Sequence, residues 1–148
     1  MADYYLEDFE PGRTYTSPSL TVTDAEAVDF ARRYDPQYFH LDPVAARDSV
    51  FGGLVLGGFQ TAAISWALVQ QTRMFDASAL AGIGVDELRW HKPVRPGDTL
   101  RCDFTLIDAR ASRTQDDRGI VRFRYELKNQ RDELVLSLVI IQLLRRRP

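Results

Sequence analysis

The sequence predicts an α+β fold in which an antiparallel sheet wraps around a long central helix. Up to about residue 75 the apolar residues recur at helical spacing, whereas from about residue 80 they recur in short runs rich in β-branched and aromatic residues. Between these halves, residues 61–74 are good helix formers and are apolar on more than one side, which is typical of a buried helix. A buried helix followed by consecutive antiparallel strands indicates the α+β class.

The first helix is expected in the segment "TDAEAVDFARRY". Thr23 can cap this helix, and Glu26 can reach back to complete a capping box. Pro36 disfavours helical geometry at Asp35, so we expect the helix to end near Tyr34. Asp35 then lies where the helix gives way to a loop.

Two more helices are expected before residue 75. The segment "DPVAARDS" offers Asp42 as a cap and Pro43 at the first helical position. The long helix of residues 61–74 is preceded by Gly57 and Gly58. Glycines at that place permit unusual backbone angles and leave amides uncovered by side chains.

The second half is expected to form strands. Residues 96–98 mark a tight turn between "GIGVDELRWHKPV" and "RPGDTLRCDFTLIDAR". In "IVRFRYELKN" apolar and charged residues alternate, which predicts a sheet with one face in water. The turn "NQRD" leads into "ELVLSLVIIQLL", which is almost continuously apolar and is therefore predicted to be a central strand.

The size and charge of the chain exclude several classes of protein. Of its 148 residues, 45% are apolar and 27% are charged, which suits one domain over residues 1–148. The formal net charge of −2 gives no electrostatic reason to expect a nucleic-acid partner. The basic run Arg145–Arg147 is expected to be a solvated end.

Cysteine content and hydropathy indicate the compartment. Cys102 is the only cysteine, so a disulfide within the chain and a four-cysteine zinc site are both excluded, and its alternating segment predicts a small core residue. The first residues lack the pattern of a secretory signal, and no run approaches the roughly 20 apolar residues of a membrane helix. We therefore expect a cytoplasmic protein without a membrane partner.

The segment "YDPQYFHLDP" carries the candidate chemistry. General acid–base reactions of carbonyl compounds near neutral pH use an imidazole, often with a carboxylate that orients a water molecule, and Asp35 and His40 supply these two groups. Five positions are too many for one helical turn, but a looping backbone can direct both side chains into one cleft. From the residues alone, a loop held by its own hydrogen bonds remains the alternative.

The glycines before the long helix are a second candidate feature. A helix N-terminus has free amides and about half a positive charge, which polarise a carbonyl oxygen placed there. Gly57 and Gly58 would let a ligand approach that closely, or else they simply let the helix pack tightly against the sheet. The spacing in "GGLVLGG" matches neither the dinucleotide nor the Walker fingerprint.

Other chemistries have little support. His40 and His91 are far apart in sequence, and His91 is expected to pack or to lie at a strand edge, so a carboxylate site at Asp42 or Asp48 is the remaining alternative for a metal. No serine lies in a nucleophile elbow. We therefore expect no metal site.

The stretch "YDPQYFHLDPVAARDSVFGGLVLGGFQT" resembles the MaoC-like dehydratases, a family that includes the (R)-specific enoyl-CoA hydratases. That family's motif has an Asp, a His five positions later, a helix start of the Leu-Asp-Pro type, a Phe about eleven residues beyond the His, and a Gly that introduces the long helix. These places are filled here by Asp35, His40, residues 41–43, Phe51 and Gly58. The segment "ELRWHKPVRPGDTL" is similar to the family's strand and turn, and the resemblance covers about residues 9–144.

This resemblance implies a hot-dog fold and a homodimer, or a higher homo-oligomer, in which two sheets run together. It also implies an acyl-CoA thioester substrate in a tunnel at the dimer interface, with no further cofactor. In the family's reaction, Asp35 and His40 would activate a water molecule that adds across the 2,3-double bond of an enoyl-CoA. The backbone amide of Gly58 would hold the thioester oxygen.

Three positions depart from the family pattern and leave the acyl pocket undefined. Gln37 replaces an Asn, Tyr38 replaces a Pro, and Gly57 replaces the His that often precedes the oxyanion glycine. We expect the substrate to contact Gln37, Tyr38, Phe51, Gly57 and Phe59. Another aromatic residue of the long helix, residue 66, could narrow the pocket or serve only in packing.

Two alternative functions stay open. A hot-dog thioesterase would need a carboxylate near the long helix, and none is obvious between Gly57 and Trp66. A non-catalytic acyl-CoA binding module has no need of Asp35 and His40. We therefore expect a hydro-lyase that interconverts enoyl-CoA and 3-hydroxyacyl-CoA.

Overall fold

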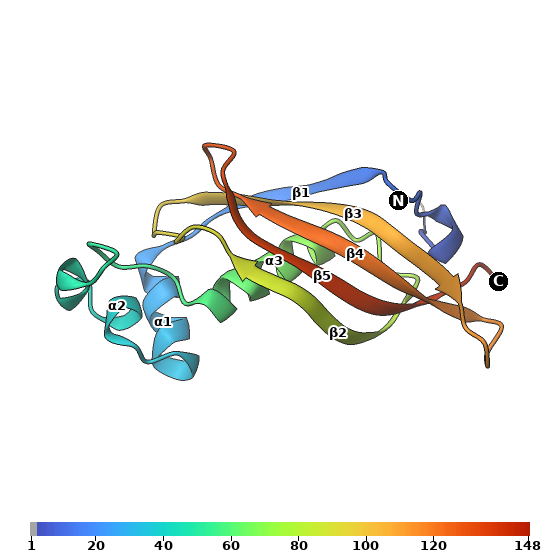
Figure 1. Cartoon of the computed structure of the whole chain (residues 1–148), viewed down its shortest axis with the longest axis horizontal. Helices are drawn as coiled ribbons and strands as arrows, with labels where there is room; N and C mark the ends of the chain where they lie inside the picture. Colours follow the sequence, from blue (N-terminus) through green and yellow to red (C-terminus); the bar gives the residue numbers. More distant parts are fainter. Residues whose placement is uncertain (1–2) are drawn as a thin grey trace.

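The computed structural model describes residues 3–148, in which one antiparallel sheet curls around a long helix (Figure 1). The five strands lie in the order β1-β3-β4-β5-β2. Their bounds are β1 (Thr14–Thr21), β2 (Ala79–Trp90), β3 (Thr99–Ala111), β4 (Arg118–Lys128) and β5 (Leu134–Arg145). The helices are α1 (Asp24–Tyr34), α2 (Tyr38–Leu41) and α3 (Gly58–Gln71), with single 3-10 turns at Leu6–Asp8 and Ala45–Asp48. The predicted α+β class and hot-dog arrangement are confirmed.

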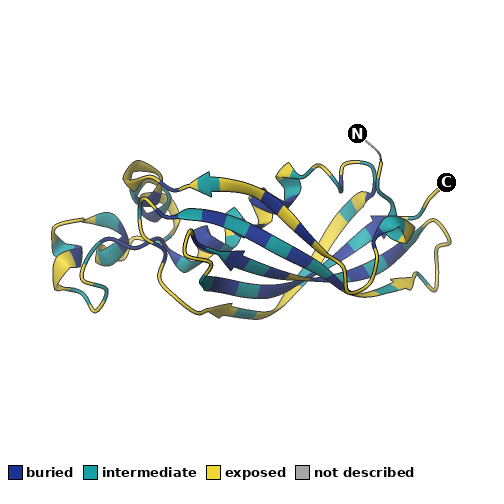
Figure 2. Cartoon of the chain, turned by 90° about the horizontal axis from the view of Figure 1, so that it is seen from above, coloured by how far each residue is buried: buried dark blue, intermediate teal, exposed yellow. Residues whose placement is uncertain are grey.

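The core lies between α3 and the inner face of the sheet. Buried and exposed residues alternate along the strands, as the pleat requires (Figure 2). Aromatic rings fill its centre, where Phe75 packs edge-on against Phe123 with centroids 5.5 Å apart, and Phe9 stacks on Phe75 at 5.0 Å. Cys102 is fully buried, as predicted, and burial raises the pKa of its thiol.

Helix α1 begins and ends where the sequence predicted. The Thr23 hydroxyl accepts a hydrogen bond from the Glu26 amide at 3.2 Å, and the Glu26 carboxylate accepts one from the Thr23 amide at 3.4 Å, so the capping box is formed. The backbone leaves the helix at Asp35, whose amide still donates to the Ala31 carbonyl at 2.9 Å. Asp35 is therefore fixed by the end of a capped helix.

The connection after α1 differs from the prediction. Residues 38–41 form the short helix α2 where a loop was expected, and the expected helix in "DPVAARDS" is only the 3-10 turn Ala45–Asp48. The Asp42 carboxylate accepts from the amides of Val44 and Ala45 at 2.9 and 3.1 Å and so holds the bend before the 3-10 turn. The cap position of that turn is Val44, which makes no side-chain capping bond. The four residues of α2 make little more than one helical turn, which is too short to show helical spacing of apolar residues in the sequence.

Helix α3 begins three residues earlier than expected and ends three earlier. Gly58 is its first residue. Glycine is tolerated at this position, because the first amides of a helix have no partner within the helix. At the other end the Thr72 hydroxyl donates to the Val69 carbonyl at 2.7 Å, and Arg73 turns to φ 61°. The helix is buried on its sheet side alone, since Phe59 and Trp66 are exposed on its other side.

The strand order differs from a simple meander. The turn at residues 95–98 is present, with Gly97 at φ 94° and the Arg95 amide donating to the Asp98 carboxylate at 2.9 Å. It does not join neighbouring strands, because β2 pairs with β5 at one edge of the sheet and β3 lies between β1 and β4. Strand β5 is central, as predicted.

The last two arginines of the basic end are partly exposed, as expected of a solvated end, and they also form ion pairs. Arg146 donates to the Glu7 carboxylate at 2.8 Å, and Arg147 pairs with Asp8. These ion pairs hold the two ends of the chain side by side (Figure 1). No helix in the described part of the chain is long and apolar enough to cross a membrane.

Candidate active site

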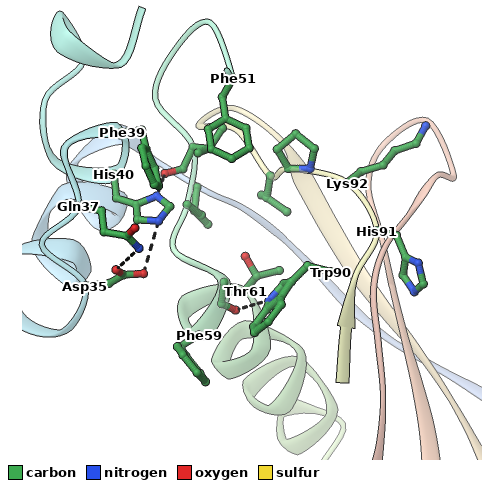
Figure 3. Close-up of a pocket in the computed structure, with 15 residues that line it drawn as sticks. Asp35, Gln37, Phe39, His40, Phe51, Phe59, Thr61, Trp90, His91 and Lys92 are labelled. Carbon is green, nitrogen blue, oxygen red and sulfur yellow. Dashed lines mark hydrogen bonds and ion pairs between the residues drawn. The ribbon is translucent and has the colours of Figure 1, made fainter. Parts of the chain in front are cut away.

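A cavity of about 490 Å³ lies between the α1–α2 segment, the N-terminus of α3 and the end of β2 (Figure 3). Polar and aromatic residues are interspersed around it. The polar or charged lining residues are Asp35, Gln37, His40, Thr61, His91 and Lys92. The aromatic lining residues are Phe39, Phe51, Phe59 and Trp90.

The hydrogen bonds of His40 fix its tautomer. Nδ1 lies 2.7 Å from the carbonyl oxygen of Val55, and because a carbonyl can only accept, Nδ1 carries the hydrogen. In the neutral ring the lone pair is therefore on Nε2, which lies 3.4 Å from Oδ2 of Asp35. The two side chains are only 7% and 16% exposed, so this pair is largely shielded from bulk water.

Asp35 is held from two sides. Its Oδ1 accepts a hydrogen bond from Nε2 of the Gln37 side chain at 2.8 Å, which leaves Oδ2 directed toward His40 (Figure 3). A carboxylate oxygen and an unprotonated imidazole nitrogen are both acceptors, so a donor with two hydrogens satisfies both. A water molecule has that property, and the geometry is suited to holding one between Asp35 and His40.

The N-terminus of α3 lies against this pair. No side chain caps it, which leaves its first amides open to a ligand. A Cβ atom built on Gly57 would lie 2.8 Å from Oδ2 of Asp35, so the carboxylate and the helix end are in direct contact. From the sequence, these glycines either allow tight packing or let a ligand approach the helix end. The structure shows tight packing at Gly57, and at the same place it shows helix amides that no side chain caps.

The cavity brings together most of the residues predicted from the sequence. Gln37, Phe51, Gly58 and Phe59 line it together with Asp35 and His40. Gly57 lies just behind the lining, and the half-exposed Tyr38 is not among the lining residues. Residue 66 also lies outside the lining.

Sequence reasoning missed several residues of the site. Phe39 packs between His40 and Phe51, with ring centroids 4.6 and 5.3 Å away. Trp90 and Lys92 come from the end of β2 and the connection after it, which local patterns do not place beside α3. His91 was expected at a strand edge, and its Nε2 lies 2.7 Å from the Ser137 hydroxyl.

Lys92 is fixed by the β4–β5 turn. Its ammonium pairs with Glu133, which also accepts hydrogen bonds from Arg131 and Asn129. The hydrogen bond from Lys92, followed by those from Arg131 and Asn129, lowers the pKa of Glu133 to about 2. A cation is thereby held at the side of the cavity opposite Asp35 (Figure 3).

These groups together suit acid–base chemistry on a carbonyl compound. The pair of Asp35 and His40 can take and return a proton, and the amides of the helix end can stabilise a developing oxyanion. In residues 3–148 no group of three or more His, Cys, Asp or Glu side chains is arranged to hold a metal ion.

Comparison with known proteins agrees with this fold. The model of the MaoC-like domain family matches residues 8–126. A crystal structure of a MaoC-like dehydratase from Rhodospirillum rubrum superposes with a TM-score of 0.89 and 38% identity, covering 97% of this chain and 98% of that one.

Two curated proteins are similar in sequence. The uncharacterized protein YdeM of Bacillus subtilis (strain 168) is 29% identical over 141 residues, which cover 95% of this chain and 99% of YdeM. The mesaconyl-CoA hydratase of Cereibacter sphaeroides is 41% identical over 70 residues, which cover 47% of this chain and 20% of that protein.

Proposed function

The chain belongs to the MaoC-like domain family, and from that premise we propose that it is a hydro-lyase which reversibly adds water to a 2-enoyl-CoA to give a 3-hydroxyacyl-CoA. The observation that carries this proposal is the pairing of Asp35 and His40, 3.4 Å apart, beside the uncapped N-terminus of α3. The similarity to a hydratase of a CoA thioester supports the choice of substrate class.

The first step of the proposed reaction uses the fixed tautomer of His40. A water molecule donates one hydrogen to Oδ2 of Asp35 and the other to Nε2 of His40. As the water oxygen bonds to C3 of the substrate, Nε2 takes one proton. That proton is afterwards delivered to C2, so that one water molecule is added in total and the pair returns to its starting state.

The second requirement is a place for negative charge. When the oxygen nucleophile bonds to C3, the electron pair of the double bond moves through C2 toward the thioester oxygen. The Gly58 amide and the positive end of the helix dipole stabilise this enolate-like charge. The same site serves the reverse reaction, in which the proton leaves C2 before the hydroxyl leaves C3.

We further propose that the active molecule is a homodimer. Within the described residues both edge strands lack a further neighbour; β1 carries Pro18 and one bulge, and β2 carries three irregularities. We infer the β2 edge because Phe59, an exposed residue of α3, contacts Trp90 at the end of β2, and Trp66 is a further exposed apolar residue of α3. A second copy that continues the sheet through its own β2 would cover these residues around a two-fold axis.

Hydration of crotonyl-CoA tests the proposed activity. The enoyl-thioester absorbance should fall when the protein is added, and the rate should drop by about 10²–10⁴-fold in Asp35→Asn and in His40→Ala. Asp29→Asn is the matched control, because Asp29 lies on α1, the helix that ends just before Asp35, and forms an exposed ion pair with Arg33. Release of free thiol with an intact double bond would show a thioesterase instead, and binding without turnover would show a binding module.

A further inference from the structure

Trp90 makes a specific contact with the helix end that the proposed reaction uses. Its indole Nε1 donates a hydrogen bond to the carbonyl oxygen of Gly58 at 2.8 Å (Figure 3). A Cβ atom built on Gly58 would lie only 2.6 Å from Cε2 and 2.7 Å from Nε1 of that ring. The indole therefore lies directly on the backbone of the first turn of α3, and only glycine leaves room for it.

This tryptophan is not placed there to fill the core. It is 49% exposed, and its ring contacts Phe59 edge-on with centroids 5.7 Å apart. Strand β2 carries an irregularity between Asp86 and Arg89, with Glu87 at φ 54°. The register resumes with Arg89, which places Trp90 opposite Leu136. Leu136 belongs to the core, so the bulge returns Trp90 to the face of the sheet on which α3 packs.

The contact fixes the direction of the amides that face the cavity. No side chain caps α3, so the Trp90 indole is the side chain that ties the first turn to the sheet through a hydrogen bond. The Gly58 carbonyl shares a peptide unit with the Phe59 amide, so the hydrogen bond from Trp90 fixes that unit directly. The packing of the indole against the Gly58 Cα holds the preceding peptide unit, which carries the Gly58 amide, and a rotation about this Cα would move that amide away from the substrate oxygen. Stabilisation of an oxyanion depends steeply on such placement, and a misplacement of about 1 Å can cost about 100-fold in rate.

We propose that Trp90 is a positioning residue, which sets the Gly58 amide for the oxyanion through its hydrogen bond to the Gly58 carbonyl and its packing on that glycine. This inference rests on the proposed function, because it gives Trp90 a part in the same reaction. It predicts that the indole donor matters for kcat and much less for the binding of the thioester.

The first test separates the donor from the ring. Trp90→Phe keeps an aromatic ring beside Phe59 but removes the donor, and we expect kcat to fall about 10-fold or more while KM changes less than about threefold. Trp66→Phe is the matched control, since it makes the same change at the other tryptophan, which lies on α3 and outside the cavity lining. An unchanged kcat in Trp90→Phe, with active wild-type protein, overturns the inference and leaves the proposed function standing.

The second test uses the close approach at Gly58. Gly58→Ala should be severely impaired, because its methyl group meets the indole. In a Trp90→Ala background the same Gly58→Ala change should cost at least about 10-fold less than in the wild type, since the obstructing ring is gone. Equal losses in the two backgrounds would show that the indole does not set this site.

A binding measurement tests the placement of Trp90 separately from the hydration activity. The Trp66→Phe variant has Trp90 as its only tryptophan, so its fluorescence reports on the cavity wall, and titration with butyryl-CoA should change that emission. An emission that saturates with butyryl-CoA supports the placement of Trp90 beside the thioester, and an unchanged emission contradicts it. Absence of hydration by the wild type overturns the proposed function and the role of Trp90 with it.

Discussion

At the scale of single residues, the site depends on contacts between backbone and side chain more than on the two catalytic candidates themselves. His40 acquires a defined proton because a carbonyl, that of Val55, accepts from its Nδ1. Asp35 acquires a defined orientation because Gln37 occupies one of its oxygens and Gly57 lies against the other. Each of the two side chains is thus oriented by a hydrogen bond to one of its atoms.

Gly57→Ala tests this contact without removing a functional group. The new Cβ would lie 2.8 Å from Oδ2 of Asp35, so the carboxylate has to shift, and we expect kcat to fall about 10–100-fold with little change in melting temperature. The backbone at Gly57 has φ −59° and accepts alanine without strain. Gly53→Ala is the matched control, because its methyl group would meet only the Arg95 guanidinium at an ordinary 3.5 Å. Equal kcat values in the two variants would count against the crowding of Asp35.

The sequence predicted the part of the site that residues 35–59 form, including Phe51 and Phe59, but not the part that comes from the end of β2. Asp35 and His40 lie within one short segment, so their spacing and their relation to the α3 glycines can be read directly. Trp90 and Lys92 reach the cavity only through the pairing of β2 with β5, a contact between segments far apart in the chain. Tyr38, in contrast, was expected in the pocket from its position between the two, but α2 directs it outward.

At the scale of elements, the helix caps and turns hold the site. Helix α1 delivers Asp35 at its C-terminal end, and its N-terminal end is fixed by the capping box of Thr23 and Glu26. The cap was predictable because it is local, three residues apart. The strand order was not, because the residues 91–98 connect β2 and β3 across the sheet, and a turn signal says nothing about which strands become neighbours.

Thr23→Ala should destabilise the protein by about 0.5–2 kcal/mol, since the Glu26 amide loses its acceptor. Urea unfolding measures this difference in the free energy of unfolding. Thr114→Ala is a suitable control because Thr114 lies in the exposed turn between β3 and β4 and caps no helix. If both variants unfold at the same urea concentration, the capping box contributes nothing measurable to the stability.

The β4–β5 turn should make stability depend on pH in the acid range. Because hydrogen bonds from Lys92, Arg131 and Asn129 lower the pKa of Glu133 from 4.5 to about 2, its contribution is complete above about pH 4.5 and is lost as the pH falls toward 2. We therefore expect Glu133→Gln to lower the melting temperature near pH 7, and the difference from wild type to shrink below about pH 4.5. Glu10→Gln, which removes a carboxylate from an exposed pair with Arg13, is the matched control for the loss of a surface ion pair. A difference from wild type that is constant with pH would be inconsistent with the lowered pKa.

At the scale of the whole molecule, the isolated chain leaves one apolar face uncovered. Helix α3 was expected to be buried on several sides, yet one apolar side is exposed. That exposed side continues onto the edge strand, where Val85 is opposite Ile140, a core residue, and therefore lies on the helix side of the sheet. An apolar helix face next to an unpaired strand edge is a surface that a second copy can complete.

Val85→Lys tests this surface on the whole molecule. A lysine on the helix side of the edge strand would place a charge within the proposed interface, so we expect sedimentation equilibrium to give the mass of two chains for the wild type and of one chain for the variant. Ile107→Lys is the matched control, because Ile107 is a comparably exposed apolar residue on β3, 42% against 49% for Val85, away from the β2 edge.

The Val85 variant should also lose hydration activity, since Phe59 and Trp90 would then line a cavity left open to water on the side that the partner covers. A Val85 variant that stays dimeric would place the dimer contact elsewhere, and a wild type that sediments as one chain would rule out the dimer. A monomeric variant with full activity would show that each chain forms its site alone.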